Sequence, residues 1–206
     1  MEDVLELYAQ PYDPQAPVVC MDEASKQHIK ETRNPIPMNS GSVEKYDCEY
    51  ERNGVSSIFM LFEPLSGQRH VYVKERRTQV DWAHTMKDLV DVHYPNAEKI
   101  RVVMDNLNTH KTASLYLAFA PEEALRIAQK IEIHYTPKHG SWLNMAEIEL
   151  GVLAGQCLNR RIPDRETMEK ECQAWASNRN RENRKANWQF TAKDARVKLR
   201  RLYPMV

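Results

Sequence analysis

The chain has 206 residues and equal numbers of basic and acidic side chains, 29 of each, so its formal net charge is zero. It is 42% hydrophobic and 28% charged, which is ordinary for a globular domain and argues against an intrinsically disordered chain. No run approaches the roughly 18 apolar residues of a membrane span, and the acidic opening MEDVLELYAQ does not resemble a secretory signal. The four cysteines include no C-x-x-C pair, which argues against a zinc finger or a disulfide framework. We therefore expect a cytoplasmic protein without a membrane partner.

The charges are distributed unevenly along the chain. Residues 155–206 carry 13 Lys and Arg against 6 Asp and Glu, whereas residues 1–154 carry 16 against 23. A basic C-terminal segment could contact phosphates, although a solvated helix face would have the same composition. Acidic residues gathered at a metal site would contribute to the negative charge of the body.

The first half of the chain predicts a short helix and then strands. Residues 1–15 read as a helix and a proline-containing linker. An apolar strand follows from Val18, and Asp22 lies at its tip. Three further runs rich in β-branched and aromatic residues are separated by Asn-Gly at 53–54 and Ser-Gly at 66–67. These pairs favour tight turns, so we expect two successive hairpins.

The second half alternates helices with strands. Helical spacing predicts an amphipathic helix over 78–94, helical structure over 111–130 with a break near Pro121, and a helix over 141–158 capped by Ser141. The runs KIRVVMDN and IEIHYTP read as the strands between these helices.

The C-terminal part is expected to be helical around a polar loop. A helix around Trp175 precedes an Asn- and Arg-rich loop at 177–187, and Thr191 with Asp194 can cap a closing helix. Strands followed by alternating helices and strands predict an α/β fold, a mixed sheet covered by helices.

Three carboxylates occupy positions that suit a site at one edge of such a sheet. Asp22 ends the first apolar strand, Asp105 ends the fourth, and Glu147 lies about two turns into the helix after the fifth. Ligands gather beyond the carboxyl ends of strands in open sheets, so Asp22 and Asp105 are expected to be neighbours if their strands pair. Taken singly, each residue could equally be a turn former, a helix cap or a solvated side chain.

The segments CMDEAS, VVMDNLNTHK and HGSWLNMAEIEL resemble the three blocks of bacterial insertion-sequence transposases related to mariner elements. The resemblance covers about residues 16–200. It implies a DDE endonuclease domain with a ribonuclease-H-like fold and a five-stranded mixed sheet, in which Asp22, Asp105 and Glu147 are catalytic. We accordingly expect a linker over residues 1–15, a catalytic domain over 16–160, and a basic helical segment over 161–206 packed on it.

The chemistry of three acids favours magnesium or manganese, because these ions prefer oxygen ligands whereas zinc favours His or Cys. Two ions about 3.5 to 4 Å apart can activate an attacking oxygen and stabilise a leaving one. The resemblance implies that such a site cuts DNA at transposon ends and joins the freed 3′-hydroxyl to target DNA. We expect Asp22 and Asp105 to be the main ligands and Glu147 to complete the second ion's shell.

Other polar residues near the three blocks are secondary candidates. Asn106 and Asn144 lie within the blocks, and His110 could bind a catalytic carboxylate or a phosphate, or make an ordinary helix-cap contact. The neighbouring acids Glu23 and Glu149 should point away from Asp22 and Glu147. Candidate contacts to DNA phosphates are Lys138, Arg160, Arg161, Arg184 and Lys185.

The family that the chain resembles carries a helix-turn-helix region ahead of its catalytic domain, and this chain begins where the linker is expected. The chain is then either the second reading frame of a split element, whose helix-turn-helix part is separately encoded and joined by frameshifting, or a truncated relic or an isolated domain. We expect the DNA complex to hold a homodimer on the bacterial nucleoid. An inactive relic that binds DNA or dimerises with a full-length transposase is the alternative. A nuclease acting on RNA–DNA hybrids is a third reading.

Overall fold

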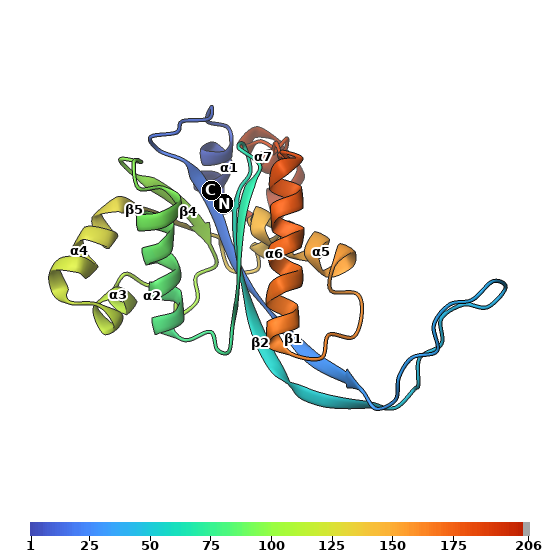
Figure 1. Ribbon diagram of the computed structural model, residues 1–206. Helices are drawn as coiled ribbons and strands as arrows, with labels where there is room; N and C mark the ends of the chain where they lie inside the picture. Colours follow the sequence, from blue (N-terminus) through green and yellow to red (C-terminus); the bar gives the residue numbers. More distant parts are fainter. Residues whose placement is uncertain (204–206) are drawn as a thin grey trace.

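The computed structural model describes residues 1–203 and contains a mixed five-stranded sheet in the order β3-β2-β1-β4-β5 (Figure 1). β1 pairs antiparallel with β2, and β2 with β3, whereas β1 with β4 and β4 with β5 are parallel. The α/β class and the five-stranded mixed sheet expected from the sequence are confirmed. The strands are β1 (Val18–Glu31), β2 (Tyr50–Glu63), β3 (Gln68–Lys74), β4 (Ile100–Met104) and β5 (Ile131–Tyr135).

Helices cover both faces of the sheet, and each face has its own apolar core. One face carries α2 (Gln79–Asp88), the π-helical turn η1 (Leu89–His93), α3 (Ala113–Ala118) and α4 (Pro121–Lys130). The other carries α1 (Glu2–Tyr8), the 3-10 turn η2 (Ser141–Leu143), α5 (Met145–Gln156), α6 (Arg165–Arg181) and α7 (Ala192–Lys198), which the short turn η3 (Arg200–Leu202) follows. None of the helices in residues 1–203 combines the length and apolarity needed to cross a membrane.

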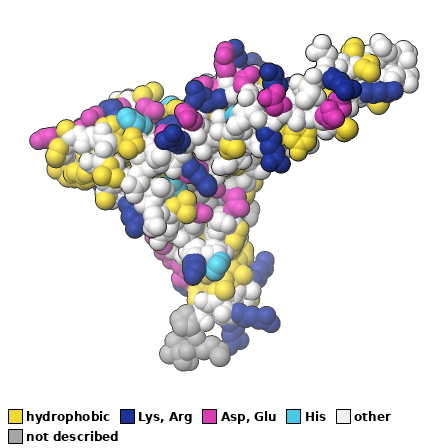
Figure 2. Space-filling model, turned by 90° about the horizontal axis from the view of Figure 1, so that it is seen from below, with side chains coloured by type: hydrophobic (Ala, Val, Ile, Leu, Met, Phe, Trp, Pro, Cys, Tyr) yellow, Lys and Arg dark blue, Asp and Glu magenta, His cyan; other side chains and the backbone are white. Residues whose placement is uncertain are grey.

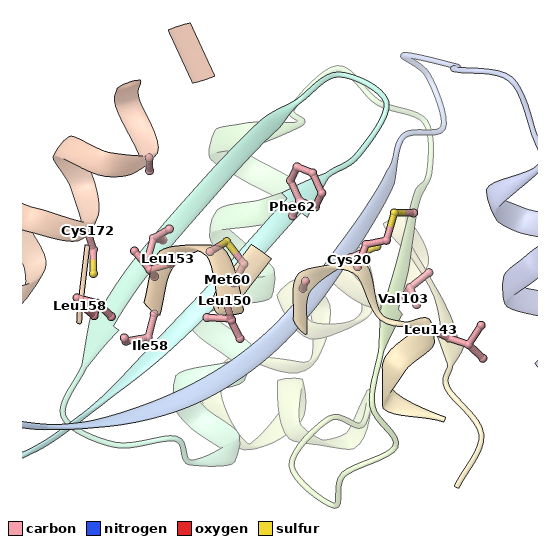
Figure 3. Packing of buried hydrophobic residues seen from close by; sticks show 14 of the residues in the cluster. Cys20, Ile58, Met60, Phe62, Val103, Leu143, Leu150, Leu153, Leu158 and Cys172 are labelled. Carbon is pink, nitrogen blue, oxygen red and sulfur yellow. The ribbon is translucent and has the colours of Figure 1, made fainter. Parts of the chain in front are cut away.

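The core under α5 shows how the sheet and this helix fit together. Cys20 of β1 and Val103 of β4 lie next to each other with Leu143 close by, while Leu150 and Leu153 of α5 lie over the central strands (Figure 3). All five side chains are buried. Alternate residues of β1 and β4 therefore face α5, and the residues between them face α2.

The N-terminal helix belongs to the folded core. Four of the seven residues of α1 are buried in the α5-side core: Val4, Leu5, Leu7 and Tyr8. The Tyr8 hydroxyl donates a 2.8 Å hydrogen bond to the Leu143 carbonyl oxygen. Residues 1–15, expected to form a helix and a linker, thus help to hold η2, which leads into α5.

The first two strands are longer than the sequence predicted. β1 does not end at Asp22 but continues to Glu31, and its second half pairs with the start of β2. The hairpin expected at residues 53–54 is also wrong, because Gly54 lies inside β2 with a φ of 90°. The β1–β2 register shifts nearby, between Gln27 and Ile29 of β1. The Asn-Gly pair therefore lies at a β-bulge or similar irregularity in paired strands and not in a turn. With the loop 32–49, these strand halves form an arm that projects from the body (Figures 1 and 2).

The second hairpin is confirmed. The turn between β2 and β3 contains Gly67 with a φ of 73°. A Cβ at this position would lie 3.1 Å from backbone atoms of Asn183 and Arg184, in the loop after α6. Gly67 therefore meets two demands, a left-handed backbone and a close approach between chain segments.

Some helix ends lie where the sequence predicted them, and others do not. Thr78 and Asp81 form a reciprocal capping box at α2, and Thr191 with Asp194 forms the predicted one at α7. Ser141 is not the cap of α5, because residues 141–143 make a 3-10 turn and Asn144 takes the cap position. The loop expected from residue 177 begins later, since α6 runs to Arg181.

Candidate active site

Asp22 of β1 and Asp105, the residue after β4, occupy corresponding positions on neighbouring parallel segments. The last paired residues of β1 and β4 are Cys20 and Val103, and each aspartate follows two positions later. Side chains two apart share a face of a strand, so both aspartates continue the face of Cys20 and Val103, which packs under α5. Asp105 follows the end of β4, as predicted, whereas Asp22 lies in the middle of β1, opposite Met60 of β2.

Glu147 reaches the same side of the sheet from the first turn of α5. It is the third residue of this helix rather than two turns into it, because Asn144 is the cap. The Asn144 side chain accepts from the Ala146 N–H at 3.2 Å and donates to the Met21 carbonyl oxygen at 2.8 Å. One buried amide thus both starts α5 and ties its N-terminus to the strand residue that precedes Asp22.

These three carboxylates are not neutralised by the protein. Within residues 1–203, no Lys, Arg or His forms an ion pair with any of Asp22, Asp105 or Glu147. Burial raises the pKa of Asp22 from 3.8 to about 6, and the negative charges of Asp105 and Glu147 add to this rise. The charges of Asp105 and Glu147 thus act on Asp22 in the same direction as burial.

The donor set suits a hard divalent cation. Asp22 Oδ1 accepts from the Glu23 N–H at 2.8 Å, and Asp105 Oδ1 accepts from the Thr136 hydroxyl at 2.6 Å, so each carboxylate keeps its other oxygen for a ligand. In this conformation, no three Asp, Glu, His or Cys side chains of residues 1–203 converge enough to enclose a metal ion. Oxygen-only donors fit magnesium or manganese better than zinc.

The acids next to the candidate ligands have different surroundings. Glu23 faces the α2 side, where its carboxylate lies 3.0 Å from His110 Nε2. Glu149 is buried between Arg69 at 2.8 Å and Arg179 at 2.7 Å. Both residues therefore point away from the three unpaired acids, as the strand and helix periods predict, and Glu149 anchors α5 to β3 and α6.

The secondary candidates separate into buried and exposed residues. His110 is fully buried, and its Nδ1 lies 2.9 Å from the Asp105 carbonyl oxygen, so it makes neither the contact to a catalytic carboxylate nor the helix-cap contact considered from the sequence. Asn144 is fully buried at the cap of α5, whereas Asn106 is exposed. Sequence reasoning missed Thr136, although a hydroxyl directly after a parallel strand is a signal of the same kind as Asp105.

The candidate phosphate contacts do not gather at one place. Lys138 is exposed in the loop between β5 and α5, which leads to Glu147. Arg160 pairs with Glu171, and Arg161 pairs with Glu31 of the arm, both at 2.5 Å. Arg184 and Lys185 lie at the far end of α6 beside Gly67, where Arg184 pairs with Glu182. Figure 2 shows basic and acidic side chains interspersed on the face that it views.

Comparison with known proteins adds a family and a fold. A family model described as DDE superfamily endonuclease matches residues 17–169. The Mos1 mariner paired-end complex with Mn has a TM-score of 0.59 at 14% identity, covering 86% of this chain and 52% of that chain. The Mos1 strand transfer complex gives 0.60 at 12% identity, covering 89% and 55%. The chain thus spans about half the length of these neighbours, whose likeness confirms the expected ribonuclease-H-like fold. No curated protein sequence matches it significantly.

Proposed function

Because the chain belongs to the DDE superfamily endonucleases, we propose that it is the catalytic domain of a transposase that cuts DNA and transfers the cut strand. The observation that carries this proposal is the set of three acids on one side of the sheet, Asp22, Asp105 and Glu147, which no basic residue of the described chain neutralises. Repulsion between unpaired carboxylates destabilises a fold, and a bound cation would relieve it.

We assign the three carboxylates as ligands of two divalent ions, magnesium or manganese. Asp22 and Asp105 are the main ligands because rigid parallel strands hold them, and Glu147 completes the coordination of the second ion from the N-terminus of α5. Thr136 holds one oxygen of Asp105 and leaves the other free to bind. Asn144 fixes the distance between α5 and β1. Ions bound there would activate a water or a 3′-hydroxyl and stabilise the leaving oxygen of a phosphodiester.

The proposed partner is double-stranded DNA, as transposon ends and as target. Lys138 is the best-placed candidate contact because its loop leads to Glu147, whereas Arg160, Arg161, Arg184 and Lys185 would act at a distance from the acids. A homodimer in the DNA complex completes the proposal, together with a bacterial cytoplasm where the protein associates with the nucleoid. Phosphate contacts of this kind give affinity that falls with salt.

A nicking assay on supercoiled DNA tests the proposed function. We expect nicking in Mn²⁺ or Mg²⁺, none in EDTA, and none by Asp105→Asn, whose fold is checked by circular dichroism. Asp13→Asn makes the same change at an exposed aspartate away from the site and should nick like the wild type. A labelled 3′-hydroxyl end supplied with target DNA should also become joined to it.

Two results would overturn this assignment. Equal nicking by wild type and Asp105→Asn would show that the activity does not come from this site. A wild-type chain that binds DNA but neither cuts nor joins it, with Asp22→Ala indistinguishable from it, would instead identify the inactive DNA-binding relic. Cleavage confined to RNA–DNA hybrids would identify a different nuclease.

A further inference from the structure

A buried histidine–glutamate pair lies on the opposite side of the sheet from the three acids. His110 is completely buried, and the Glu23 side chain is 3% exposed. His110 Nε2 lies 3.0 Å from Glu23 Oε1, and its Nδ1 lies 2.9 Å from the Asp105 carbonyl oxygen. One imidazole therefore links the residue after Asp22 to the backbone of Asp105.

The link spans a gap in the sheet. The ladder between β1 and β4 ends at Cys20 and Val103, so no β1–β4 backbone pairing reaches Asp22 and Asp105. Beyond that point β1 continues into the arm, while the chain after β4 turns toward α3. Something other than the ladder must fix the separation of the two aspartates.

The His110 ring is held firmly enough to do this. Its plane stacks on Trp82 of α2, with ring centroids 6.1 Å apart and an angle of 26° between the planes. The His110 carbonyl oxygen accepts a 2.6 Å hydrogen bond from the Tyr135 hydroxyl of β5. A carbonyl oxygen only accepts, so Nδ1 donates to the Asp105 carbonyl oxygen, while Nε2 faces the Glu23 carboxylate. Both nitrogens of the buried ring are thus engaged.

We propose that His110 and Glu23 are positioning residues that set the spacing of Asp22 and Asp105 for divalent-ion binding. This inference rests on the proposed function, because it assumes that the two aspartates hold the metal. His110 acts through the backbone of Asp105 and touches no reacting atom. The contacts around metal ligands orient the ligands, and their loss typically weakens metal affinity about 10- to 100-fold.

The test compares substitutions that remove the same charge. Glu23→Gln keeps a hydrogen-bonding group toward His110, whereas Glu23→Met has similar size and none. Both variants lose one negative charge beside Asp22, so a difference between them reports the hydrogen bond alone. The measurement is the Mn²⁺ dissociation constant, by electron paramagnetic resonance of free Mn²⁺, on protein whose folding is verified by circular dichroism. We expect Glu23→Met to bind Mn²⁺ about tenfold more weakly than Glu23→Gln.

A second pair of variants tests the role of His110 in Mn²⁺ binding. His110→Gln can keep the contact to Glu23 but loses the one to Asp105, and it should weaken Mn²⁺ binding about 10- to 100-fold. His28→Gln is the matched control, because His28 is another buried histidine, hydrogen-bonded to Ser56 at 2.8 Å on the distal part of β1. It should leave Mn²⁺ binding unchanged. If Glu23→Met does not fold, the comparison of His110→Gln with His28→Gln tests the proposal.

The outcomes separate this inference from the proposed function. Equal Mn²⁺ affinity within each pair would overturn the positioning role, provided that Asp22→Asn and Asp105→Asn still abolish binding. If those two aspartate variants bind Mn²⁺ like the wild type, the proposed metal site itself fails. A lower melting temperature for His110→Gln with unchanged Mn²⁺ affinity would assign His110 to the fold and also overturn the inference.

Discussion

Replacing Asp22 by asparagine should stabilise the metal-free protein while removing the proposed metal site. Raising a carboxyl pKa from 3.8 to about 6 corresponds to about 3 kcal/mol that disfavours the ionised form in the folded state. Asp22 is partly exposed, so solvent screening reduces this to about 2 kcal/mol. The asparagine side chain would carry no charge, and its oxygen could still accept from the Glu23 N–H.

The stabilisation should depend on pH in a defined direction. The folded-state pKa of Asp22 is raised, so between pH 3.8 and about 6 the folded protein binds more protons than the unfolded chain. Stability from this group is therefore lost as pH rises through that window. Asp22→Asn should gain about 2 kcal/mol at about pH 8 and less than half of that at about pH 4.5.

Urea unfolding in EDTA measures this gain, and thermal melts with Mn²⁺ measure the loss of the site. For a chain of this size, about 2 kcal/mol corresponds to a rise of about 4 to 8 °C in melting temperature. Mn²⁺ should raise the melting temperature of the wild type but not that of Asp22→Asn. A variant no more stable than wild type in EDTA at the higher pH, or equally stabilised at both pH values, would refute the account of Asp22 as a buried acid beside other acids.

Three further substitutions test contacts that stabilise the fold around α5 and at the turn between β2 and β3. Asn144→Ala removes the cap of α5 and the bond to Met21, so urea unfolding should show a loss of about 2 to 3 kcal/mol. Glu149→Gln breaks a buried ion-pair cluster and should cost about 3 to 5 kcal/mol, while Mn²⁺ affinity of the folded protein stays unchanged. Gly67→Ala should lower the melting temperature more than Gly54→Ala, because only the former meets backbone atoms at 3.1 Å; equal losses would contradict this.

Local signals predicted the elements whose ends depend on neighbouring residues. The apolar run ending in Asp105 became β4 with its acid directly beyond, and the pairing of Thr191 with Asp194 became a capping box. In both cases the deciding contacts lie within a few residues. Such features follow from strand burial and from the hydrogen-bonding needs of helix N-termini.

The features that sequence reasoning missed depend on distant partners. Gly54 has the chemistry of a hairpin turn, but pairing of β2 with the long β1 places it inside a strand. Ser141 and Asn144 are both good caps, and Asn144 takes the position where its amide also reaches Met21, 123 residues earlier. Strand register and cap choice are therefore settled by tertiary contacts that a local pattern does not contain.

The candidate acids and the directions of their neighbours were predicted by residue positions and by the strand and helix periods, but the partners of those neighbours required the structure. Asp22 and Glu23 are adjacent, yet alternation along β1 sends Glu23 to a buried imidazole and leaves Asp22 without a basic partner among the described residues. The same division occurs on α5, where Glu149 meets two buried arginines and Glu147 meets none in residues 1–203. Each structural acid thus has a basic partner, and each neighbouring site acid lacks one within that part of the chain. A cation from solution is the partner that we propose for the unpaired acids, and the charge pairing supports this proposal more strongly than the acidic residues alone.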